Sequence, residues 1–186
     1  MSDRIDAATR RQLERLRNMA RQRPARIEAP GPGQESVWDY PRPPRLEPVA
    51  EPVRVCLAGV VLAQSRAALR VCETASPPTL YLPPEDVRMD LLEPTSGNTL
   101  CEWKGSARYF SVRVGDRLSQ RAAWSYPRPF EGYERLAGYL AFFPGRVDAC
   151  LIGDERATPQ PGEYYGGWVT QKLVGPFKGE PGSEGW

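Results

Sequence analysis

The sequence predicts a mainly β domain of antiparallel strands, preceded by one helix and a proline-rich arm and followed by an aromatic tail. Short runs of alternating apolar and polar residues recur from residue 53 to about 153, as in a half-buried sheet. The chain has 20 Pro and 17 Gly in 186 residues, which favours many turns and few long helices. Several short strands at turn spacing are typical of a β-sandwich or partly open barrel.

Residues 5–22 predict the only long helix. Leu13 and Leu16 lie three apart on an apolar stripe, arginines cover the remaining surface, and Pro24 ends the helix. The arginines could suit a nucleic acid or an acidic partner. We favour the simpler interpretation, a solvated helix that docks through a thin apolar stripe.

Residues 24–52 are rich in proline and lack any period, so we expect an extended arm. Val37, Trp38 and Tyr40 are its large apolar side chains and are candidates for anchoring it to the domain. The chain therefore divides into a helix and arm (1–52), a β domain (53–153) and a tail (154–186).

The clearest strand is 107–114, where Phe110, Val112 and Val114 share one face. Gly115-Asp116 turns the chain, and 118–124 pairs back. A second hairpin is expected across Pro144-Gly145, between strands 139–143 and 147–152. The other expected strands are 53–57, 60–63 (after a turn at Ala58-Gly59), 69–73, 79–82 (separated from 69–73 by Pro77-Pro78) and, with weaker patterns, 88–92 and 99–101.

The tail after Asp154 is rich in Pro and Gly but also carries several aromatic residues. Burying one large aromatic side chain contributes about 2 kcal/mol, so we expect the tail to pack on the domain or on a partner subunit. A floppy tail is the alternative. The aromatic residues concerned are Tyr164, Tyr165, Trp168, Phe177 and Trp186.

Charge and hydropathy restrict the partners. The chain has 25 Lys+Arg and 23 Asp+Glu, a formal charge of +2, which argues against nucleic acid as a partner. No run approaches the roughly 20 apolar residues of a membrane-spanning helix, so we expect no membrane partner. The charged N-terminus lacks the apolar segment of a signal peptide, and we expect a cytoplasmic protein.

The chain contains no histidine. This excludes Ser-His-Asp and Cys-His catalysis, histidine-ligated metals and histidine pH switches. No two cysteines form a Cys-x-x-Cys pair, so we expect folding without zinc, without disulfides and without a resident cofactor. The scattered cysteines are Cys56, Cys72, Cys101 and Cys150.

The densest chemical segment precedes the clearest strand, in an expected loop. It brings together the Cys101 thiol, the Trp103 indole, the Lys104 ammonium and Gly105, with Tyr109 just beyond. A lysine held there could bind a phosphate or carboxylate, and the glycine would let a ligand approach the backbone. The alternative is a surface lysine beside a turn glycine.

Two further segments offer supporting groups. Glu73 precedes Pro77-Pro78, whose rigid backbone suits the rim of a pocket. Carboxylates at Glu85, Asp86 and Asp90 could hold a hard cation, but they fit the start of a helical turn better. Trp124-Ser-Tyr-Pro-Arg-Pro129 is a rigid aromatic loop with one guanidinium, which could stack a base or cover a core edge. The candidate ligand-binding residues are Lys104, Trp103, Gly105, Tyr109, Cys101, Glu73, Pro78, Tyr81, Trp124 and Arg128.

The order of several motifs resembles domain-of-unknown-function family 427, which is also labelled a nucleotidyltransferase domain. The resemblance covers about residues 53–153, and the segments Tyr165-Gly-Gly-Trp-Val and Gly175-Pro-Phe-Lys-Gly are similar to longer members. It implies a compact tent-like fold of two antiparallel sheets that meet at an angle. The chain lacks the Cys-x-x-Cys pairs of zinc-binding relatives and the histidines that family members often carry at positions 76 and near 98. The motifs are Ser65-Arg-Ala-Ala-Leu69, Tyr81-Leu-Pro-Pro-Glu-Asp-Val87, Cys101-x-x-Lys-Gly-x-Ala-x-Tyr109, Trp124-Ser-Tyr-Pro-x-Pro129 and Gly138-Tyr-Leu-Ala-Phe-Phe-Pro-Gly-Arg-Val-Asp148.

Three functional hypotheses follow, in order of preference. The first is a β domain that binds a small anionic ligand near Lys104. The second is an enzyme of nucleotidyltransferase-like or other phosphate-handling type, with Lys104 and Arg128 as anion clamps and an acid or base among Glu73, Asp86, Cys101 and Glu102. The third is a protein-interaction module that uses the N-terminal arm. The ligand, the oligomeric state and catalysis itself stay open at this point.

Overall fold

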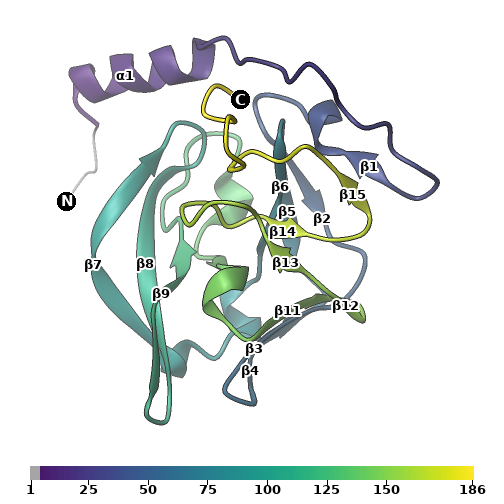
Figure 1. Cartoon of the computed structure of the whole chain (residues 1–186). Helices are drawn as coiled ribbons and strands as arrows, with labels where there is room; N and C mark the ends of the chain where they lie inside the picture. Colours follow the sequence, from purple (N-terminus) through teal and green to yellow (C-terminus); the bar gives the residue numbers. More distant parts are fainter. Residues whose placement is uncertain (1–4) are drawn as a thin grey trace.

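The computed structural model describes residues 5–186 and is mainly β with a single α-helix in that range. Helix α1 (Ala7–Asn18) begins at Asp6, whose side chain accepts a hydrogen bond from Thr9 N at 2.8 Å. It ends before Met19, which is extended, so the expected helix over 5–22 is right in type but four residues too long at its end. In Figure 1, α1 lies across one end of the β structure, and the chain then crosses that end as an extended arm.

Three antiparallel sheets contain most of the strands, which confirms the mainly β fold class. The first has the strand order β10-β9-β8-β7, the second β12-β11-β3-β4 and the third β2-β5-β6. Their strands are β2 (Arg45–Pro48), β3 (Val53–Leu57), β4 (Val60–Ser65), β5 (Leu69–Glu73), β6 (Ser76–Tyr81), β7 (Leu92–Cys101), β8 (Gly105–Val114), β9 (Arg117–Ser125), β10 (Leu140–Phe142), β11 (Ala149–Ile152) and β12 (Glu155–Arg156).

Smaller elements tie the two ends of the chain to these sheets. Strand β1 (Glu35–Ser36) pairs in parallel with β15 (Leu173–Val174), and β13 (Thr158–Pro159) pairs antiparallel with β14 (Trp168–Val169). Within the described residues, single-turn 3-10 helices occur at Val37–Asp39, Pro84–Asp86, Met89–Leu91, Glu134–Leu136 and Pro144–Arg146.

The local turn predictions are mostly confirmed. Strands β8 and β9 form a hairpin across Gly115-Asp116, and β3 and β4 form one across Ala58-Gly59. The hairpin expected across Pro144-Gly145 is wrong, because β10 pairs with β9 whereas β11 pairs with β3. The 3-10 turn between them carries the chain from one sheet to the other.

Two further expectations are corrected. Residues 88–92 are mainly a 3-10 turn (Met89–Leu91) rather than a strand. Pro77 and Pro78 lie inside β6 instead of separating two strands. They are tolerated there because β6 is the last strand of its sheet and its register with β5 shifts between the pairs Val71–Thr79 and Glu73–Ser76, so both prolines fall in an irregular stretch of an edge strand.

The core has an aliphatic part and an aromatic part. The aliphatic part lies under β3, β4 and β11 and includes the fully buried Val53, Val55 and Leu57. The aromatic part lies between the ends of β6, β9 and β10. Its large members are Tyr81, Trp124, Tyr126, Tyr133 and Phe143.

The C-terminal residues pack closely against the sheets and the arm. Trp168 is only 1% exposed, and its indole N–H donates to Phe142 O at 3.2 Å. Trp38 of the arm donates to Pro176 O at 2.9 Å and contacts Trp186 edge-on, with 5.3 Å between ring centroids. Figure 1 shows the C-terminus beside the arm. The boundaries at residues 52 and 153 stay a prediction.

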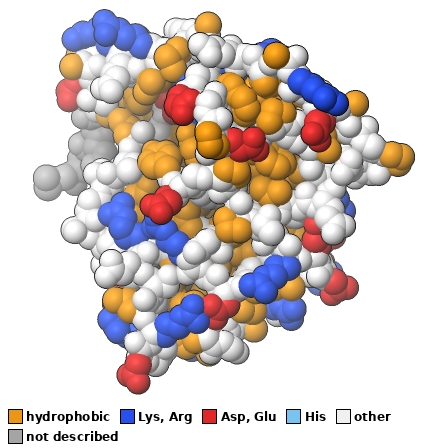
Figure 2. All heavy atoms as spheres, viewed as in Figure 1, with side chains coloured by type: hydrophobic (Ala, Val, Ile, Leu, Met, Phe, Trp, Pro, Cys, Tyr) orange, Lys and Arg blue, Asp and Glu red, His pale blue; other side chains and the backbone are white. Residues whose placement is uncertain are grey.

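The described surface combines charged and apolar side chains. Figure 2 shows apolar side chains gathered across the middle of one face, with basic and acidic side chains around them. Across residues 5–186, no helix has both the length and the apolar composition needed to cross a membrane. The four cysteines are free.

Candidate functional site

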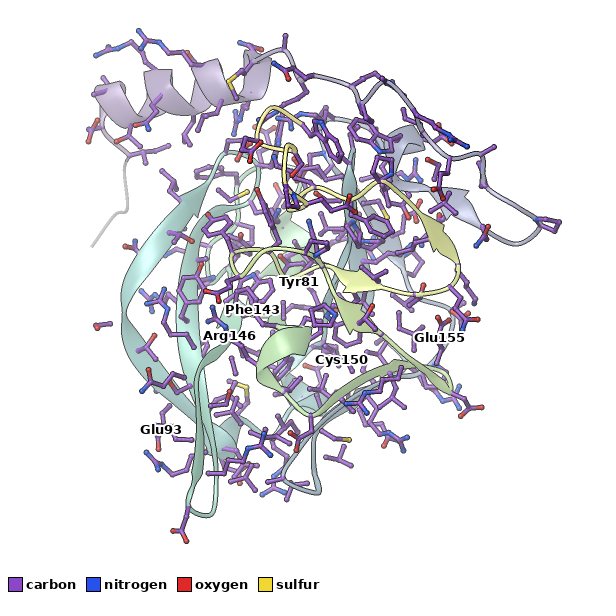
Figure 3. The ribbon with its side chains drawn as sticks, viewed as in Figure 1. Tyr81, Glu93, Phe143, Arg146, Cys150 and Glu155 are labelled. Carbon is purple, nitrogen blue, oxygen red and sulfur yellow. The ribbon has the colours of Figure 1, made fainter. Side chains whose placement is uncertain are left out.

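A cavity of about 260 Å³ lies where the aromatic core meets the C-terminal segment. In Figure 3, Tyr81 and Phe143, which both line it, lie close together near the centre of the molecule. The cavity also collects charged groups from three parts of the chain: the N-terminal arm, the β7–β8 turn and the C-terminal segment. These charged residues are Arg21, Glu73, Glu102, Lys104 and Lys178.

Lys104 is presented by the turn between β7 and β8. Cys101 pairs with Gly105 across that turn, and Phe130 N donates to Lys104 O at 3.2 Å, which anchors the turn from behind. Gly105 has φ +96°, and a Cβ there would lie 3.3 Å from the Phe130 ring and 3.4 Å from Arg128 O. Only glycine fits this conformation easily, so the turn directs Lys104 inward.

The Lys104 side chain is buried and unpaired. The residue is 9% exposed, and among residues 5–186 no carboxylate lies within ion-pair distance of its ammonium. Its Nζ lies over the Tyr126 ring, 5.8 Å from the ring centroid. Burial alone would lower the pKa of Lys104, but Cys101, Tyr126, Tyr81 and Glu73 around it raise that pKa well above its ordinary value. The group is therefore a permanent cation, and buried cations are ordinarily paired.

Aromatic side chains form the floor beneath this cation. Trp124 packs against Phe143 with 4.3 Å between ring centroids and against Tyr81 edge-on at 6.2 Å. Burial raises the pKa of Tyr81 to about 12 and raises that of Tyr126 well above its ordinary value. Both phenols therefore keep their protons at neutral pH, and each can donate a hydrogen bond.

The carboxylates at the cavity are already engaged with arginines. Arg42 donates to Glu73 at 3.2 Å and lies 3.6 Å from Glu102. Arg21 lies 3.7 Å from the same Glu102 oxygen, and Arg17 of α1 donates to Glu102 O at 2.7 Å. Glu73 and Glu102 therefore hold the N-terminal arm and are not left to neutralise Lys104.

The C-terminal segment supplies a second lysine. Lys178 N donates to Ala75 O at 2.7 Å, and Gln160 Nε2 donates to Lys178 O at 2.8 Å. Gln160 is 4% exposed and also accepts from Gly167 N at 3.2 Å, so one buried amide joins two separate parts of this segment. Within residues 5–186, the Lys178 ammonium also lacks a carboxylate within ion-pair distance. Burial and Arg21 lower its pKa.

The structure brings six of the ten candidate residues to one cavity and leaves four outside it. Trp103 lies outside, between the guanidinium groups of Arg17 and Arg42, at 5.5 and 5.4 Å from its ring centroid. Gly105 shapes the turn, Pro78 lines a different cavity and Arg128 is exposed. The residues brought together are Glu73, Tyr81, Cys101, Lys104, Tyr109 and Trp124. Their roles in binding stay a proposal.

Sequence reasoning missed several lining residues. Tyr126 lies two positions after Trp124, so strand alternation could have found it. Lys178 and Gln160 stand in a Pro/Gly-rich segment with no local pattern, and only the folded chain brings them to the cavity. The remaining missed residues are Arg21, Val71, Ser76, Thr79, Thr99, Leu100, Phe143, Tyr164, Tyr165 and Gly166.

Other hollows lack this charge pattern. A groove of about 750 Å³ is lined mostly by exposed residues, among them Arg54, Arg66 and Asp154. In a cavity of about 220 Å³, Arg70 is paired with Glu35 and Lys172 with Glu51. The Lys104 cavity differs from the second of these because its lysines are not ion-paired within the described residues, and from the first because its lysine is buried.

Comparison with known proteins gives a family but no characterised relative. No curated protein matches the chain significantly. The family model described as a domain of unknown function (DUF427) matches residues 45–153, which include β2 to β11 and the turn that carries Lys104. The match spans more than half of the 186 residues, and the chain therefore belongs to the DUF427 family.

Proposed function

We propose that this protein binds a small anionic ligand in the Lys104 cavity. The observation that carries the proposal is a buried ammonium without a carboxylate partner that lines a partly open cavity. A cation held in a partly dry site attracts an anion much more strongly than a solvated cation does. The Tyr81 and Tyr126 phenols keep their protons and can add neutral donors beside it.

Binding accounts for the cavity better than group transfer does. Glu73 and Glu102 are the carboxylates at the site, and both are engaged by Arg42. To act as a general acid or base, either carboxylate would first have to break its ion pair with Arg42. Asp86 lines the open groove away from Lys104. No specific contact favours an enzyme, and the nucleotidyltransferase reading remains the weaker alternative.

The protein-interaction hypothesis has less support. The large apolar side chains of the arm, Val37, Trp38 and Tyr40, are buried against Leu173 and the C-terminal aromatics. They are therefore not available to a partner while the chain is folded as described.

The test is a Lys104→Met substitution with a ligand found by a thermal-stability screen of nucleotides, sugar phosphates, small acids and metal ions. Loss of a charge-assisted hydrogen bond costs roughly 1.5–3 kcal/mol, so affinity should fall about ten- to a hundredfold, as measured by calorimetry. Methionine is apolar and of similar length, and the far-ultraviolet spectrum should stay unchanged.

Lys172→Met is the matched control. Lys172 is exposed and paired with Glu51 at a different cavity, so its removal should leave the affinity unchanged. If Lys104→Met binds the anion as tightly as the Lys172→Met protein does, the proposed function is wrong.

A further inference from the structure

Resting on the proposed function, we propose that the ligand is a ring-bearing dianion: a flat aromatic body with two negative charges, as in an aryl phosphate. The ring lies against the aromatic floor of the cavity. Lys104 and Lys178 together neutralise the charges.

The lining of the cavity supports the ring. Trp124, Phe143 and Tyr81 form a continuous aromatic floor, and Tyr109 and Tyr164 also line the cavity. Aromatic rings pack well against one another in offset or edge-on arrangements. The rings are already largely buried by the protein, with Trp124 6% and Phe143 7% exposed, so the ligand ring would contact the parts of them that line the cavity. The volume of about 260 Å³ suits a small ring with one acidic group better than a polymer.

The charges at the cavity support a dianion. Arg21, Arg42, Lys104 and Lys178 face two carboxylates that are both engaged by the arginines. Two ammonium groups are left without a carboxylate among the described residues. They come from separate elements, the β7–β8 turn and the C-terminal segment, so a ligand with a single charge would satisfy only one of them fully.

The second lysine is held in place by a buried contact. Gln160 binds Lys178 O and Gly167 N, and its amide is almost inaccessible to solvent. Lys178 Nζ also lies 5.9 Å from the Tyr165 ring centroid, so both its backbone and its ammonium have contacts within the C-terminal segment.

Four ligands distinguish the contribution of the aromatic ring from that of the second negative charge. Phenyl phosphate has both, benzenesulfonate has the ring but one charge, methyl phosphate has two charges but no ring, and methanesulfonate has one charge and no ring. Titrations are run by calorimetry at about pH 8, where phosphate monoesters are dianions. Phenyl phosphate should bind at least about tenfold more tightly than benzenesulfonate and than methyl phosphate. Lys178→Met should reduce the preference for phenyl phosphate over benzenesulfonate to about twofold or less, a change of roughly 1 kcal/mol. Lys172→Met should leave it unchanged.

The outcomes are distinct. If methyl phosphate bound as tightly as phenyl phosphate, the proposal that the ligand carries an aromatic ring would be wrong. The proposal that the ligand is a dianion held by both lysines would be wrong in either of two cases. One is equal affinity for benzenesulfonate and phenyl phosphate; the other is a preference for phenyl phosphate over benzenesulfonate that the Lys178→Met protein retains. All three results would leave the anion site at Lys104 standing. If none of the four ligands shows saturable binding that depends on Lys104, the proposed function itself fails.

Discussion

Lys104 and Lys178 line the same cavity, yet the fold moves their pKa values in opposite directions. Acidic side chains around Lys104 outweigh its burial and raise its pKa. Lys178 is buried beside Arg21 and Arg42, and although Glu73 and Glu102 oppose them, its pKa is lowered. The two lysines should therefore lose their charges at different pH values.

This difference predicts a pH dependence of ligand affinity. As pH rises through the lowered pKa of Lys178, that lysine becomes neutral in the free protein, while Lys104 keeps its charge. A phosphate monoester is already fully charged in this range. The affinity for phenyl phosphate should therefore fall with rising pH below the ordinary lysine pKa of about 10.4, as measured by calorimetry.

Lys178→Met is the control for this titration. The variant should bind more weakly near neutral pH and show a flat profile over the same range. A flat profile in the unsubstituted protein would contradict a charged Lys178 at the ligand.

Gly166 makes a closer approach than any side chain would permit. A Cβ at this position would lie 2.2 Å from the Trp124 ring, so Gly166→Ala must push the C-terminal segment off the aromatic floor. Overpacking of this kind costs about 1–3 kcal/mol of unfolding free energy. Urea unfolding should show that loss, and affinity for an anion should fall because Lys178 shifts with its segment.

Gly145→Ala is the matched substitution. Its Cβ would make only ordinary contacts with Pro159, at 3.6 Å and beyond, so we expect a change within about 0.5 kcal/mol. Equal stability of the two alanine variants would mean that the segment does not press on Trp124.

At the scale of elements, the C-terminal strands close the cavity because β14 is fastened to the core. Trp168 is buried among the aliphatic side chains and donates to Phe142 O, and β13 pairs with β14 beside it. Gly166, between β13 and β14, then lies directly against the Trp124 ring.

Trp168→Ala should therefore destabilise the protein strongly. Truncation of a buried tryptophan costs about 3–5 kcal/mol, which corresponds to a fall in Tm of roughly 6–20 °C at this chain length. Tyr164→Ala, in the same segment but 72% exposed, should change Tm little. If the Trp168→Ala and Tyr164→Ala proteins had the same Tm, the packing of β14 against the core would contribute no stability.

Element type mostly followed from local pattern, with 88–92 as an exception, whereas strand pairing followed only for strands joined by a tight turn. Alternation across residues 107–114 predicted β8, and Gly115-Asp116 predicted its hairpin with β9. The wrong hairpin at Pro144-Gly145 shows the limit of this reasoning. Both flanking strands exist, but each pairs with a partner distant in sequence, and turn residues carry no information about that choice.

At the scale of the whole molecule, the two ends of the chain meet and complete the site. Strands β1 and β15 pair although Ser36 and its partner Val174 are 138 positions apart in the sequence, and Gln22 N donates to Gly185 O at 2.8 Å. The compact segment from Cys101 to Gly105 made Lys104 predictable from sequence. Lys178 and Arg21 reach the cavity only through this long-range closure, which has no local signature.

The central claim, that the Lys104 cavity holds an anion, is tested most directly by a crystal structure of the protein with phenyl phosphate. The account predicts phosphate oxygens within hydrogen-bond distance of Lys104 Nζ and the phenyl ring against Trp124. Phenyl phosphate bound only elsewhere, or Lys104 directed into solvent with the cavity empty, would contradict it.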